Sequence, residues 1–119
     1  MKLKIICLVE KEMFERNKKK YMQFRVDEQH IRSIQDSKDY LLNKKYIDDP
    51  LDKDILTIKV PFRYNRVMCS ITGDKTIYEL NKGDKVNADI EYCGTWSVGD
   101  YCGHAWKLHK LILYNDKVS

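Results

Sequence analysis

Three separate stretches of this chain alternate apolar with polar side chains, and this period of two restricts the fold more than any other feature. The stretches are residues 21–26, 55–60 and 88–92. Successive side chains of a strand point to opposite faces, so the period is that of strands with one buried face. The residues expected to face the core are Met22, Phe24, Val26, Leu56, Ile58, Val60, Ala88, Ile90 and Tyr92.

A first hairpin is expected near the N-terminus. Residues 3–9 are mostly apolar and partly β-branched, which suits a strand. The polar stretch 15–20 is predicted to be the turn, after which 21–26 returns as the second strand.

The period changes after Asp27, a predicted N-cap. Up to Lys45 the apolar residues recur at helical intervals, and the stretch Asp48-Asp49-Pro50 then ends the segment. Eight acidic and five basic residues lie within 27–54, so the basic excess of the chain lies elsewhere. We therefore predict a helical, acidic insertion at about 27–54. Its apolar residues are Ile31, Ile34, Leu41 and Leu42.

The second half of the chain again indicates strands. Pro61 should end the strand 55–60, and alternation resumes over 64–71. Residues 76–80 suit one short helical piece, with Thr76 and Glu79 spaced as a capping box. Strands around 85–92 and 104–114 should follow, with a glycine-framed loop around 97–101. Five strands with a short helix between the third and fourth is the order of an OB barrel. We thus expect an all-β fold with minor α content, a five-stranded OB-type barrel in one domain over 1–119.

Three strings in the second half, ELNKGDKV at 79–86, IEYCGTW at 90–96 and GHAWKL at 103–108, resemble OB-fold single-stranded DNA-binding proteins of the viral or phage type. The resemblance implies that the first string ends a barrel-plugging helix and begins a strand, and that the last string is the closing strand. The resemblance covers roughly the last 40 residues well and the first 55 only in general order. It implies a binding surface on the exposed face of strands two and three and the loops beside it, where bases stack on aromatic rings and Lys and Arg follow the phosphates.

Two clusters and one loop supply the candidate binding residues. Aromatic side chains among guanidinium and ammonium groups are what binding of a single strand needs, since rings stack on any base. The alternatives are a solvated basic sheet face, a solvated Lys turn, and Phe62 capping the core. The predicted nucleic-acid-binding residues are Lys18, Lys19, Lys20, Tyr21, Arg25, Lys59, Phe62, Arg63, Tyr64, Arg66, Trp96 and Tyr101. Trp106 alternates with Leu108 and is expected in the core.

The cysteines and carboxylates give weaker signals. Cys7, Cys69, Cys93 and Cys102 have irregular spacing, which favours reduced thiols over a disulfide framework. Zinc at Cys93, Cys102, His104 and His109 would need an unusual ligand spacing, and the two histidines have opposite parity. Asp89 and Glu91 on one strand face would suit a metal-dependent nuclease, but outward carboxylates on a strand are commonly solvated.

We therefore expect a single-stranded DNA-binding protein with little sequence preference that serves replication, recombination or repair. No catalytic activity, cofactor, metal or membrane partner is expected, and proteins of replication or recombination are the protein partners considered. The alternatives are an RNA-binding OB protein and an OB protein-interaction module that uses the acidic insertion. No apolar run reaches about 18 residues, and the N-terminal run is too short for a signal peptide, so an intracellular location is expected, in a host cell if the protein is viral.

Overall fold

The computed structural model describes residues 2–36, 46–73 and 76–113. Its main strands are β1 (Lys2–Arg16), β2 (Lys19–Val26), β5 (Ile55–Val60), β9 (Lys85–Val98) and β10 (Tyr101–Leu113). The shorter elements are α1 (Glu28–Asp36), β3 (Tyr46–Asp48), β4 (Leu51–Asp52), β6 (Phe62–Arg63), β7 (Arg66–Val67), β8 (Ser70–Thr72) and the 3-10 helix η1 (Ile77–Glu79).

The five main strands close into a ring. β1 pairs antiparallel with both β2 and β9, β2 with β5, and β9 with β10. β5 and β10 complete the ring as a parallel pair in which Lys59 is opposite Lys107. Counted along the chain, the strands follow the order 1-2-3-5-4, so the fold is the all-β, OB-type barrel expected from the sequence, with α1 inserted after the second strand.

The core fills this ring because the alternating residues point inward. The nine residues expected from the pattern are all buried except Tyr92, which packs partly buried against the others. Trp106 is 1% exposed and belongs to the same core, as its spacing predicted. η1 contributes Ile77 to the core, and Leu80, directly after η1, is also buried there. The Glu79 carboxylate accepts a hydrogen bond of 3.1 Å from the backbone N–H of Thr76, as in the predicted capping box.

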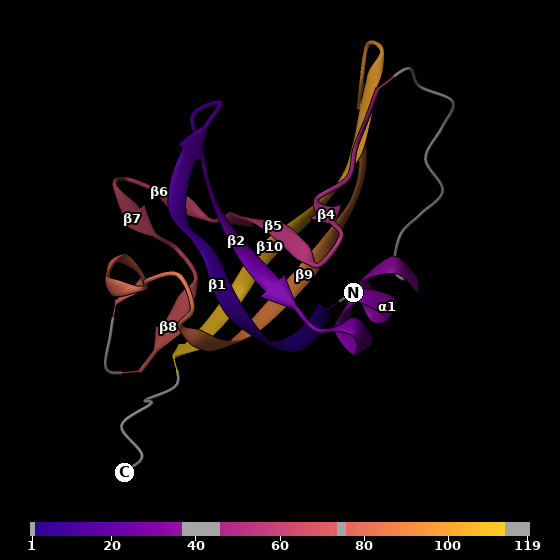
Figure 1. The fold of residues 1–119 in the computed structure, drawn as a ribbon. Coiled ribbons are helices and arrows are strands. Elements are labelled where there is room, and N and C mark those ends of the chain that lie inside the picture. Colours follow the sequence, from indigo (N-terminus) through magenta and orange to yellow (C-terminus); the bar gives the residue numbers. More distant parts are fainter. Residues whose placement is uncertain (1, 37–45, 74–75, 114–119) are drawn as a thin grey trace.

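Both long hairpins extend beyond the barrel as separate arms (Figure 1). The predicted turn at 15–20 is only Asn17-Lys18, with φ of 52° and 65°, as in the tight turns that suit twisted hairpins. The loop expected at 97–101 is likewise only a turn at Gly99-Asp100, so Trp96 and Tyr101 lie on strands. The polar residues of these arms are compatible with strands because both of their faces lie outside the core.

The chain after Pro61 differs from the expected strand. β5 ends at Val60, as the proline predicted, but β6 and β7 then form a two-stranded hairpin of their own. Its turn is Tyr64-Asn65, with φ of 53° and 59°. β8 follows and pairs with β10, so the alternation over 64–71 belongs to two short elements rather than one strand.

The insertion begins with the predicted helix. The Asp27 carboxylate accepts a hydrogen bond of 2.9 Å from the backbone N–H of His30, which confirms its capping role. Ile34 of α1 is buried in the barrel core and Ile31 packs against it. The expected helical residues after Asp36, including Leu41 and Leu42, lie outside the described residues. Among the helices that are described, none has the length and apolar character needed to cross a membrane.

Candidate functional site

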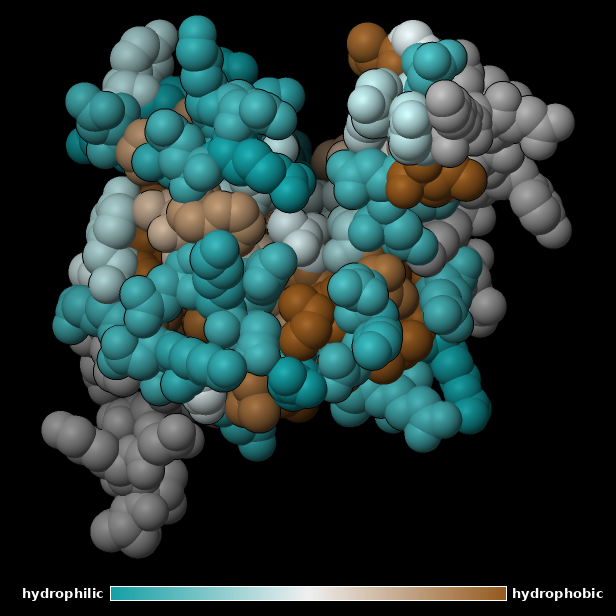
Figure 2. All heavy atoms as spheres, turned by 45° about the horizontal axis from the view of Figure 1, so that its top comes forward, coloured by the Kyte–Doolittle hydropathy of each residue, from teal (hydrophilic) through white to brown (hydrophobic). Residues whose placement is uncertain are grey.

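A groove lies between the two hairpin arms, over the outer surface of β2, β5 and β10. Its volume is about 440 Å³. In the space-filling view the surface is hollowed between two projecting lobes (Figure 2). The groove is open to solvent along the face on which OB barrels carry their ligands.

The groove follows from an interruption in strand pairing along one edge of β10. This edge pairs in succession with β3 at 101–103, with β5 at Lys107 and with β8 at 110–112. Residues 104–106 fall in the gap between β3 and β5, and all three line the groove. A bulge at Cys93 in β9 lies opposite the same gap, since Ala105 pairs with Gly94 but Trp106 pairs with Tyr92.

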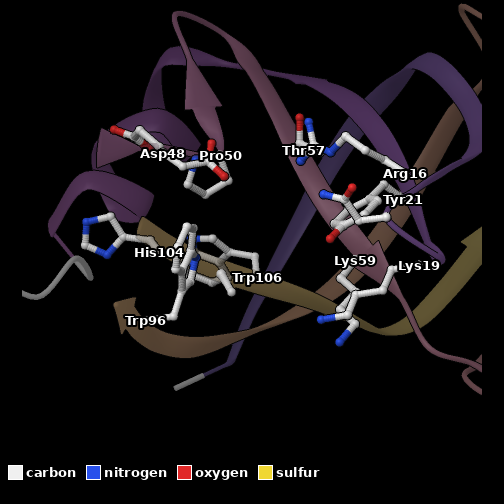
Figure 3. A pocket seen from close by; sticks show the side chains of 13 residues that line it. Arg16, Lys19, Tyr21, Asp48, Pro50, Thr57, Lys59, Trp96, His104 and Trp106 are labelled. Atoms are coloured by element: carbon white, nitrogen blue, oxygen red, sulfur yellow. The ribbon is translucent and has the colours of Figure 1, made fainter. Parts of the chain in front are cut away.

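One end of the groove is basic. Arg16, Lys19 and Lys59 line it together with Tyr21, the cross-strand partner of Lys59 (Figure 3). The guanidinium of Arg16 lies over the Tyr21 ring, 5.0 Å from its centre. Burial lowers the pKa of Lys59, and the positive charges of Lys19 and Lys107 lower it further. Lys59 is therefore repelled by Lys19 and Lys107, and an anion bound in the groove beside Lys59 would reduce that repulsion.

The other end is aromatic. Trp96, His104 and Trp106 line it, with the chain around Asp48 and Pro50 opposite (Figure 3). The Tyr92 hydroxyl is hydrogen-bonded to Nδ1 of His104 at 2.6 Å, which fixes the buried imidazole. Nε1 of Trp106 is buried and has no hydrogen-bond partner in the described part of the chain. Trp96, by contrast, is only partly buried.

Four predicted residues meet in this groove: Lys19, Tyr21, Lys59 and Trp96. They come from β2, β5 and β9, which are far apart in the sequence. The other lysines of the run 18–20 lie beside the groove. Lys18 is exposed in the turn, whereas the Lys20 ammonium is 3.2 Å from the Glu15 carboxylate and lies over the Phe62 ring.

The remaining predicted residues lie elsewhere. Arg25 is on the same face of β2 as Tyr21, but its guanidinium is 2.9 Å from Glu10 and 2.6 Å from Asp54. Tyr101 stacks on Tyr46 near the end of the β9–β10 arm, with ring centres 4.8 Å apart. The other four form the β6–β7 hairpin, where Tyr64 is 88% exposed. They are Phe62, Arg63, Tyr64 and Arg66.

Sequence reasoning missed more than half of the groove lining. Thr57 lies inside the predicted strand 55–60 on the same face as Lys59, so the outward face of that strand already indicated it. Arg16 directly precedes the turn, so a first strand extended up to the turn would have included it. The segment 48–50 was expected only to connect elements. Residues 104–106 were expected on a strand, with Trp106 in the core and His104 considered only as a zinc ligand. No local signal places these two segments together, because the groove depends on where β3 and β5 pair with β10.

The candidate metal ligands are dispersed. Cys93 and His109 are exposed, whereas Cys102 and His104 are buried. Glu91, half of the expected carboxylate pair, is 3.5 Å from the Lys107 ammonium. Within residues 2–36, 46–73 and 76–113, no three His, Cys, Asp or Glu side chains are grouped so that they could hold a metal ion.

The fold and the groove define an OB-type barrel with an open, mixed aromatic and basic surface. Neither the family models, nor the curated proteins, nor the solved structures with which the chain was compared match it. Its function is therefore argued from the groove itself.

Proposed function

We propose that the protein binds single-stranded DNA in the groove between its two hairpin arms, with little sequence preference and without catalysis. The observation that carries the proposal is the meeting of three cations with two aromatic rings in one open groove. The cations are Arg16, Lys19 and Lys59, and the rings are Tyr21 and Trp96.

These groups match the two parts of a single strand. A base stacked on an aromatic side chain contributes about 1–3 kcal/mol whatever its identity, which accounts for weak sequence preference. Phosphates neutralised by Lys and Arg release counterions, so affinity should fall steeply with salt. A double helix would not offer its base faces to Trp96.

The charge distribution also suggests how the strand lies. Asp48 and Asp49 line the groove on the side of Trp96, whereas Arg16, Lys19 and Lys59 line the opposite end. Phosphates are repelled by carboxylates, so we expect the backbone to follow the basic end and a base to stack against Trp96.

RNA binding and a protein-interaction role are the two alternatives, and the structure supports them to different degrees. RNA offers the same bases and phosphates, and only contacts to the 2′-hydroxyl would separate it from DNA. A protein-interaction role for α1 has less support, because Ile34 is used in the core of this chain and Ile31 packs against that core.

The first test is fluorescence anisotropy of a labelled oligothymidylate at two salt concentrations, with RNA of the matching sequence as competitor. We expect binding at low salt that weakens at high salt. Trp96→Ala and Lys19→Gln should each weaken it, whereas Tyr78→Ala should not, since Tyr78 is 63% exposed on η1 and does not line the groove. The absence of binding at low salt would exclude the proposal.

A further inference from the structure

A second hollow lies on the barrel beyond the groove. Its volume is about 350 Å³, and none of its lining residues lines the groove. The residues that matter here are Pro61, Met68, Ser70, Lys107, His109 and Lys110.

This hollow occupies the next gap along the same edge of β10. The groove lies between the pairings of β3 and β5, and the second hollow lies between β5 at Lys107 and β8 at 110–112. A bulge at His109 accompanies it, since Leu108 pairs with Ile90 and Lys110 with Asp89. The two hollows thus follow one another along one strand, each with its own bulge.

Lysines connect the two hollows. Lys59 lines the groove and Lys107 lines the second hollow, and the two are direct neighbours in the β5–β10 pairing. Their charges are close enough that Lys107 contributes to the lowered pKa of Lys59. Lys110 continues the row inside the hollow, and the Lys2 ammonium lies 3.5 Å from Nε2 of His109. Glu91, at 3.5 Å from Lys107, offsets one of these charges.

An apolar surface accompanies the lysines. The Met68 side chain is 53% exposed at the hollow, and Pro61 lies beside it. A thioether packs favourably against an aromatic ring, so this wall suits the flat face of a base. The hollow therefore has the same two kinds of group as the groove, cations for phosphate and an apolar surface for a base.

We infer that the second hollow is a continuation site for the same single strand of nucleic acid, with a phosphate between Lys107 and Lys110 and a base against Met68. The inference rests on the proposed function, because it extends the strand that occupies the groove. From His104 to Lys110 the strand β10 covers about 20 Å at roughly 3.3 Å per residue. A short oligonucleotide would fill the groove alone, and a longer one would occupy both hollows.

The experiment compares oligothymidylates of increasing length, from about 4 to 16 nucleotides, the range of site sizes known for OB folds. Dissociation constants are measured for the native protein and for Lys110→Gln, Met68→Ala and Lys85→Gln. Lys85→Gln is the matched control, because Lys85 lies in a different hollow, next to Ile6 and Leu8 of β1. Thermal unfolding of each variant verifies that it is folded.

For the native protein, affinity should rise with length in two stages. Lys110→Gln and Met68→Ala should leave the shortest binding oligomer unaffected and weaken the longest by about threefold to tenfold, with a salt slope smaller by about 0.7 for Lys110→Gln. Equal affinity of both variants and the control for every length would overturn the inference while leaving the groove intact. Failure of every oligomer to bind the native protein would instead exclude the proposed function.

Discussion

The ring of Trp96 lies directly over the backbone of Gly103, its cross-strand neighbour in the β9–β10 arm. A Cβ at position 103 would lie 2.8 Å from Cε2 and Cζ2 of Trp96 and 2.5 Å from the backbone oxygen of Asp48. Real Cβ atoms do not approach other atoms so closely. The glycine therefore allows both the tryptophan and β3 to lie against β10, and so shapes the aromatic end of the groove.

Gly103→Ala should accordingly displace Trp96 or β3. We expect a lower midpoint of thermal unfolding and weaker binding of oligothymidylate, because the stacking ring would move. Combining Gly103→Ala with Trp96→Ala should recover part of the lost stability, since one of the two clashes is then gone. If the loss of stability in the double variant equalled the sum of the losses in the two single variants, this account would be contradicted.

We predict that the positive charge of Lys59 lowers the stability of the fold but strengthens oligonucleotide binding. Its folded pKa is lowered by burial and by the charges of Lys19 and Lys107, so keeping it protonated costs folding free energy at neutral pH. Lys59→Met should leave the midpoint of thermal unfolding unchanged or raised while weakening oligonucleotide binding. Lys82→Met is the control, since Lys82 is exposed and lies outside the groove. A stability loss with Lys59→Met and unchanged binding would refute the prediction.

The same shift predicts a pH dependence. Between the lowered folded pKa of Lys59 and its ordinary unfolded value, the unfolded chain binds more protons, so native stability rises with pH there relative to Lys59→Met. Binding should weaken across the same alkaline window as the ammonium loses its charge. Lys59→Arg should keep its affinity over that window, because a guanidinium stays protonated. Titration of affinity between neutral pH and the ordinary lysine pKa provides the measurement.

Arg25 was predicted to bind nucleic acid, but its contacts suggest a structural role. Its hydrogen bond to Glu10 holds the pKa of that carboxyl below its usual value. The stabilisation is present above the unfolded pKa of Glu10 and is lost as pH falls through the lower folded pKa. Arg25→Gln should therefore lower the unfolding midpoint at neutral pH, with a difference from the native protein that narrows in acid. The affinity of Arg25→Gln for oligothymidylate should stay within about twofold of the native value. A larger loss of affinity would show that Arg25 contributes to binding.

Patterns of neighbouring residues in the sequence predicted the core-facing residues, the start of the helix and the end of one strand. The period of two placed the core residues of β2, β5 and β9, and Asp27 and Pro61 marked a helix start and a strand end. The groove could be only partly predicted, because its lining depends on long-range pairing. Arg25 and Tyr21 lie on the same face of β2, so alternation alone could not separate their roles. Arg25 differs because Glu10 and Asp54, which are distant in the sequence, lie beside it and pair with it. The hairpin at Tyr64-Asn65 was missed because neither residue is a glycine, although both have positive φ.

Thiol reactivity offers a probe of the groove that leaves its lysines unchanged. All four cysteines are free thiols; Cys93 is exposed at the bulge of β9, whereas Cys7 and Cys102 are buried. Burial raises the pKa of Cys7 to about 12 and also raises the pKa of the half-buried Cys69, so both should be poor thiolates at neutral pH. We expect one thiol to react rapidly with a disulfide reagent in the native protein, and Cys93→Ser should abolish that phase. The bulge at Cys93 lies opposite the gap in β10 pairing that forms the groove, so an oligothymidylate bound in the groove should slow the modification of Cys93. An unchanged rate at saturating oligonucleotide would place the bound strand away from this bulge.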